Sequence, residues 1–259
     1  MNLATKLVRS IQTDGLYRTI VRCVVYPRSL MRIRTMQRAL STRDPAVIFE
    51  TIHRATLWSK GESVSGPGSS LAYTQNLRQE LPKLLAKFSI RSIYDAPCGD
   101  FNWMSMVDLE TPGIDYRGAD IVRVVIEGNR ERHRGPRRRF DVANIISDPF
   151  PDADLWICRD ALFHFSYDDI RRTLQNFAGS NIKYILTTTH LRQGKPFANR
   201  DIPTGDYRPI DLFSEPFNFP SDVLFRITDY IEPYEPREMC LWSRQQIVEA
   251  LERFGGKAT

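Results

Sequence analysis

The sequence has no apolar run of the roughly 20 residues that a membrane-spanning helix requires. The stretch 16–26 is interrupted by Arg18 and Arg22, so it also lacks the continuous apolar segment of a secretion signal. We therefore expect the protein to be neither exported nor embedded in a bilayer, and we expect to find it in the cytoplasm.

Cysteine is scarce and widely spaced. Cys23, Cys98, Cys158 and Cys240 lie roughly 60 to 80 residues apart, which excludes both a CxxC metal knuckle and a dense disulfide framework. Reduced thiols in a cytosol fit this pattern. Because no cysteine/histidine cluster supports a tetrahedral zinc site, we predict no metal.

Acidic residues are nearly absent from 1–43. This segment holds nine lysines and arginines against the single acid Asp14, so it carries about +8 in a chain whose net charge is +5. We therefore predict a basic helical arm, 1–60, before a domain, 61–259. The arm is interpreted as a helical lid; peripheral contact with the inner membrane surface and an organellar presequence are the alternatives.

From residue 90 the chain alternates between short β-rich runs and helical or loop stretches. The β-rich runs are 90–95, 116–122, 139–142, 154–159 and 183–189, and the intervening stretches are 102–109, 124–132 and 167–177. This alternation predicts an α/β domain with a parallel sheet. Two last runs, 224–231 and 239–242, are joined by a link too short for a crossover helix and are predicted to be antiparallel.

The segment 93–104 predicts a strand that ends at Asp95 and runs through a Pro/Gly turn into a helix. Nucleotide-like ligands bind at the carboxyl ends of such strands. A dinucleotide site would need the pattern G-x-G-x-x-G, but only Gly99 is present, and Pro97 has no N–H to offer a phosphate. The turn therefore favours a ligand without phosphates, whose cationic end meets carboxylate and carbonyl groups.

This segment resembles motif I of the class I S-adenosylmethionine (SAM)-dependent methyltransferases, D/E-x-G-x-G-x-G, which here reads Asp95-x-Pro97-x-Gly99-x-Phe101. The run 95–103 also resembles a bacterial subgroup with the motif DAPCGDFNW. The resemblance implies SAM as the cofactor. It also implies a Rossmann-like fold, with a mostly parallel seven-stranded sheet and one antiparallel strand near the C-terminus, preceded by the helical arm.

The resemblance also implies a set of cofactor-binding residues. Asp120 ends the second predicted strand about 25 residues after Asp95, a register that returns the chain beside the first strand. Asp120 would bind the ribose hydroxyls, with Ile121 beside the adenine and Asp141 near the adenine amino group; an acid in a surface loop is the alternative for Asp120. The full set is Ser69, Asp95, Ala96, Pro97, Cys98, Gly99, Asp100, Trp103, Asp120, Ile121, Asp141, Val142 and Arg159. We expect the pocket to begin at the loop 63–70.

Methyl transfer needs proximity and, for a hydroxyl acceptor, a base. His164 and Asp160 follow the fourth predicted strand, where the resemblance places acceptor-side groups, and His190 ends the fifth. We predict His164 as the base, with Asp160 and His190 as alternatives, although a lone histidine is more often structural. The rate should then rise with pH through the ordinary histidine range.

The insertion 191–221 is the predicted substrate lid, because its polar and aromatic residues suit a hydroxylated ring such as a sugar. Alternatively, Phe217 and Phe219 only anchor a long loop. The sequence thus predicts an O-methyltransferase for a small hydroxylated or glycan-type acceptor. An RNA methyltransferase recruited by the arm and a non-catalytic Rossmann-like scaffold are rival hypotheses. Nucleic acid is disfavoured because the arginine run 130–139 lacks an aromatic stacking platform.

Overall fold

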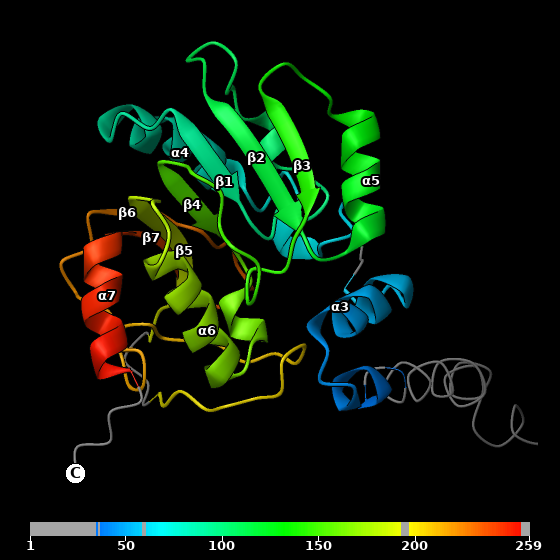
Figure 1. The fold of residues 1–259 in the computed structure, drawn as a ribbon, viewed down its shortest axis with the longest axis vertical. Coiled ribbons are helices and arrows are strands. Elements are labelled where there is room, and N and C mark those ends of the chain that lie inside the picture. The colour runs from blue at the N-terminus through cyan, green and yellow to red at the C-terminus, as the bar shows by residue number, and fades with distance from the viewer. Residues whose placement is uncertain (1–34, 36, 59–60, 193–196, 255–259) are drawn as a thin grey trace, which may run out of the picture.

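Seven strands form one sheet in the order β3-β2-β1-β4-β5-β7-β6 (Figure 1). The computed structural model describes residues 35, 37–58, 61–192 and 197–254. The strands are β1 Ser92–Asp95, β2 Asp115–Asp120, β3 Arg138–Val142, β4 Leu155–Cys158, β5 Tyr184–His190, β6 Phe225–Thr228 and β7 Arg237–Ser243. All neighbours pair in parallel except β7, which is antiparallel to both β5 and β6. The predicted fold class is confirmed.

Helices cover both faces of this sheet. They are α4 Gln75–Lys87, α5 Arg123–Arg132, α6 Tyr167–Ala178 and α7 Arg244–Arg253. A further helix, α3 Pro45–Arg54, lies beyond one edge, and the 3-10 turns are η2 Pro67–Ser69, η3 Met104–Met106 and η4 Leu162–His164. The stretch 102–109 thus forms only a single 3-10 turn. Helix was predicted within residues 1–34 of the arm, which lie outside the described residues, whereas 37–41 are helical.

The central strands are buried on both faces, as a continuous apolar run predicts for a parallel sheet. Along β4, Trp156 and Cys158 join the core beneath α6 and α7, whereas Leu155 and Ile157 join the core beneath α4 and α5. This alternation follows the two-residue period of a strand. The sheet is therefore the rigid middle layer of the fold.

The strand order reverses at β1, which has β2 on one side and β4 on the other. In open α/β sheets, ligands bind in the crevice outside the carboxyl ends of the strands at such a point. The register pairs Asp95 with Gly118 of β2 and with Ile157 of β4. The last residues of these three strands therefore lie together at one edge of the sheet.

Helix α3 lies beyond this carboxyl edge (Figure 1). Its start follows from local chemistry, because the Asp44 side chain accepts a hydrogen bond from Ala46 N at 2.9 Å and Pro45 occupies the first turn. Ile48 and Ile52 form its buried face. Gly205 packs so closely here that a Cβ on it would lie 2.3 Å from Ile48 Cγ2.

Candidate active site

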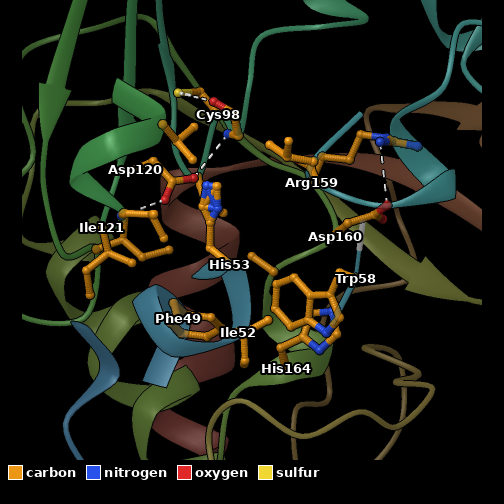
Figure 2. Close-up of a pocket in the computed structure, with 18 of the residues that line it drawn as sticks. Phe49, Ile52, His53, Trp58, Cys98, Asp120, Ile121, Arg159, Asp160 and His164 are labelled. Atoms are coloured by element: carbon orange, nitrogen blue, oxygen red, sulfur yellow. Dashed lines mark hydrogen bonds and ion pairs between the residues drawn. The ribbon is translucent and has the colours of Figure 1, made fainter. Parts of the chain in front are cut away.

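A cavity lies between α3 and the carboxyl ends of β1, β2 and β4 (Figure 2). It holds about 1160 Å³ of space outside the protein atoms, including the part that opens to solvent. The predicted site residues that line it are Ser69, Asp95, Pro97, Cys98, Gly99, Trp103, Asp120, Ile121, Arg159, Asp160 and His164.

The structure does not bring the other predicted site residues to the cavity. Ala96 is fully buried, and its carbonyl accepts a hydrogen bond from the Trp156 indole. Asp141 turns outward, where Arg117 Nε donates to its carboxylate at 2.6 Å. Val142 packs against the core beneath α4 and α5. The cavity wall next to β3 is built instead by residues 143–146.

Two buried carboxylates, Asp95 and Asp120, face the cavity. The Tyr116 hydroxyl donates to Asp95 Oδ2 at 2.6 Å, and Asp120 accepts from the backbone N–H groups of Gly99 and Val122 at 3.1 and 2.9 Å. Burial raises the pKa of Asp95 to about 7 and that of Asp120 to about 6. A cationic ligand would therefore stabilise the charged form of both groups.

Asp100 does not line the cavity but holds the loop that does. It accepts hydrogen bonds from Ser63 Oγ and Val64 N, both at 2.9 Å. The loop approaches the motif turn so closely that a Cβ on Gly99, whose φ is +55°, would lie 2.2 Å from Ser65 Oγ. A glycine is therefore needed at this position, both for its backbone conformation and for its lack of a side chain.

Arg159 and Asp160 belong to a buried ion network with Asp229 and Arg237. Arg159 donates two hydrogen bonds to the Asp229 carboxylate, at 2.9 and 3.0 Å, and a third to the Gly68 carbonyl at 2.7 Å. Arg237 donates to Asp160 Oδ2 at 2.8 Å. Burial disfavours the charge on Asp160, but the two guanidinium groups outweigh it and hold the pKa of Asp160 below its ordinary value. Asp160 is consequently a weak base.

His164 lies at the end of the cavity away from Asp120 (Figure 2). Its Nδ1 lies 2.8 Å from the carbonyl oxygen of Asp206, so Nδ1 carries the hydrogen and Nε2 keeps the lone pair. Burial lowers the pKa of His164 to about 4, so the ordinary histidine range predicted from the sequence is wrong for this residue. The imidazole is therefore neutral, and able to accept a proton, across the physiological pH range.

His190 is not part of the cavity wall. It is buried at the end of β5, and its Nδ1 accepts a hydrogen bond from Ile210 N at 3.2 Å. Burial and the nearby charge of Arg237 lower its pKa to about 4. These contacts give His190 a structural position between β5 and the segment that follows it.

No protein-family model and no curated protein matches the sequence. Solved structures do match. The methyltransferase domain of the bacterial protein CtHen1 superposes with a TM-score of 0.51 at 14% identity, covering 66% of this chain and 98% of that one. Magnesium protoporphyrin IX methyltransferase from Synechocystis PCC 6803, with bound S-adenosylhomocysteine (SAH), gives 0.51 at 12% identity over 74% and 93%. The N-methyltransferase NodS from Bradyrhizobium japonicum WM9 gives 0.50 at 9% identity over 66% and 96%.

The chain has a SAM-dependent methyltransferase fold. At these identities the likeness concerns the path of the backbone, so the roles of individual side chains must be argued from this site itself. Among the described residues, no group of acidic, histidine and cysteine side chains is arranged to hold a metal ion. None of the described helices is long and apolar enough to cross a bilayer.

Helix α3 belongs to the arm 1–60, which the sequence predicted to be helical and to act as a lid, but no residue of this arm was predicted to line the pocket. Pro45, Phe49, Ile52, His53 and Trp58 all line it, so the expectation that the pocket begins at Ser63 is wrong. His53 points from α3 to the side where Asp120 lies, and Trp58 lies against His164 (Figure 2). The N-cap at Asp44 agrees with the predicted helical arm, but no local signal in the sequence indicated that α3 contacts a distant sheet edge.

The insertion 191–221 packs against α3 on the side away from the cavity, and we call α3 the lid from here on. None of its described residues lines the cavity. Asp206 orients His164, and Gly205 packs against α3. Phe217 and Phe219 are buried in the core beneath α6 and α7, as the alternative of an anchored loop predicts. Helix α3 therefore covers the cavity, which the sequence had predicted for the insertion.

Proposed function

We propose that this protein is a SAM-dependent methyltransferase that transfers a methyl group to an oxygen of a small acceptor. The observation that carries the proposal is the pair of carboxylates, Asp95 and Asp120, at the strand-order reversal of a methyltransferase fold. The donor set fits SAM, because carboxylates attract its sulfonium and amino cations and the turn at Pro97 offers no phosphate cradle. Asp95, Gly99, Asp120 and Ile121 would hold the cofactor.

When bound, SAM supplies an electrophilic methyl group, which passes to the acceptor oxygen as the C–S bond breaks and SAH remains. The protein has three tasks in such a reaction. The strand ends hold the cofactor, α3 excludes water, and His164 Nε2 takes the proton that the acceptor hydroxyl loses. The Asp206 carbonyl orients the imidazole for this task, because it fixes the hydrogen on Nδ1.

Titration calorimetry with SAM and SAH tests the proposal. We expect both to bind, and Asp120→Ala to weaken binding by about 1 to 3 kcal/mol, the scale of a lost charge-assisted hydrogen bond. Asp115→Ala is the matched control, because Asp115 is an exposed acid at the other end of the same strand. If neither compound bound, the result would instead support the non-catalytic scaffold. Equal affinities of native protein and Asp120→Ala would show that Asp120 does not bind the ribose.

A further inference from the structure

We infer that the acceptor is a flat, apolar ring system that carries its hydroxyl on the ring, and that Trp58, which follows α3 in the chain, selects it. This inference rests on the proposed function and names its substrate class. The part of the cavity around His164 is called the acceptor compartment below, and is defined by Phe49, Ile52, Trp58, His164 and Phe165.

Aromatic rings surround this compartment. Trp58 stacks on His164 with ring centroids 4.5 Å apart and an interplanar angle of 25°. Phe49 lies 5.8 Å from Trp58 and 5.9 Å from Phe165, centroid to centroid. Such spacings are those of interacting aromatic pairs, so a planar ring entering here meets ring faces and edges suited to it.

The compartment offers few partners to a polar acceptor. Of Phe49, Ile52, Trp58 and Phe165, only Trp58 carries a polar atom, its indole N–H. The neighbouring Asp160 is already engaged by Arg237 and Arg159. A sugar would bury several hydroxyls here, and each one without a partner would weaken its binding. The sequence predicted a glycan-type acceptor from the insertion 191–221, but none of the residues that the structure describes in this insertion lines the cavity.

The chemistry of His164 points to the same class. An imidazole held neutral among apolar rings is a weak base, and its proton transfer is most effective from an acidic hydroxyl. A hydroxyl on an aromatic ring is far more acidic than one on a sugar or an aliphatic chain. Methyl transfer to it forms the O–C bond, breaks the C–S bond and leaves the hydroxyl proton on Nε2, from which water removes it after release.

The experiment compares three probes on native protein saturated with SAH. They are 2-naphthol, its saturated counterpart decahydro-2-naphthol, and methyl β-D-glucopyranoside. We expect 2-naphthol to bind at least about tenfold more tightly than either of the others, because only it is flat and aromatic. With SAM in place of SAH, we expect SAH formation with 2-naphthol and none with the glucoside.

Substitutions of Trp58 test whether this side chain is responsible for the preference for 2-naphthol. We expect Trp58→Ala to weaken 2-naphthol binding about tenfold, Trp58→Phe to keep most of it, and both to bind SAH as the native protein does. Met106→Ala is the control, because Met106 is exposed and lies outside the cavity. A preference for the glucoside, no binding of 2-naphthol, or an unchanged affinity in Trp58→Ala would each overturn the inference. Failure of SAH itself to bind would instead overturn the proposed function.

Discussion

Asp95 and Asp120 are buried acids whose pKa values, about 7 and about 6, fall within the range in which enzymes are assayed. Their charged forms are the ones that a cation such as SAM would bind. Protons must therefore leave the site as SAM enters it whenever the pH lies near or below these values.

We expect the affinity for SAM to fall as the pH falls. Both carboxyl groups are ionised at pH 8, whereas at pH 5.5 protonation competes with the ligand, so the dissociation constant should rise roughly ten- to a hundredfold. Calorimetry in two buffers of different ionisation enthalpy would also detect the released protons. In Asp120→Asn the rise should be smaller, since one titrating group is gone. A pH-independent affinity would contradict this account of the site.

His164 makes a prediction about rate. Because its pKa lies at about 4, the turnover rate should stay level above about pH 6 and decline below about pH 5, instead of rising through the ordinary histidine range. His164→Ala should keep SAM affinity within about threefold and lower turnover by roughly 10² to 10⁴. Initial-rate measurements across pH would test both statements.

His190→Ala is the natural comparison for His164→Ala. His190 has an equally low pKa but lies outside the cavity, so this variant should lose stability and keep its turnover per folded molecule. If His164→Ala kept near-native turnover, His164 would not be the base, and the reaction would depend only on holding the two reactants close together.

At the scale of elements, Gly205 sets the position of α3. Its φ is +99°, and a Cβ would collide with Ile48 of the helix. We expect Gly205→Ala to push α3 off the cavity, so that amides of α3 exchange with solvent at least about tenfold faster while those of β1 and β4 do not change. Hydrogen exchange followed by mass spectrometry would measure this.

Gly113→Ala separates backbone strain from that collision. Gly113 also has a positive φ, +69°, but the nearest atom to its added Cβ is 4.0 Å away. It should therefore destabilise the protein without loosening α3. If the two alanine variants gave the same exchange pattern, Gly205 would have no special part in seating the helix.

The ion network ties β4 to the loops around it. Asp229 is almost wholly buried and binds Arg159 through both oxygens, so Asp229→Ala leaves a buried guanidinium without its main partner. We expect a loss of about 3 to 5 kcal/mol in the free energy of unfolding, measured by urea denaturation. The exposed pair of Arg137 and Asp115 is the comparison, since Asp115→Ala should cost under about 1 kcal/mol.

At the scale of the whole molecule, the fold could be predicted because its signals are local. Apolar runs such as Leu155–Cys158 act within a few residues, and their alternation with helical stretches along the chain determines the layers. Asp95 and Asp120 could be predicted for the same reason, since each ends a strand whose neighbour follows from the α/β pattern.

The other half of the cavity depends on contacts that no local pattern encodes. Trp58 meets His164, and Arg159 meets Asp229, across roughly 70 to 110 residues of chain. Asp141 shows the converse, because its place at a strand end was read correctly while its side chain turned toward Arg117. A single sequence indicates the periodicity of each element, but it does not indicate which residue of another element a surface side chain will contact.

Helix α3 faces both ends of the cavity, with His53 on the side of Asp120 and Phe49 beside Trp58, which stacks on His164 (Figure 2). Under the proposed function, one displacement of this helix would uncover cofactor and acceptor together. Arrival and departure of the two ligands would then share a single opening event. If that event is slower than the chemistry, all good acceptors will be turned over at the same maximal velocity and will differ only in the concentration needed to reach it.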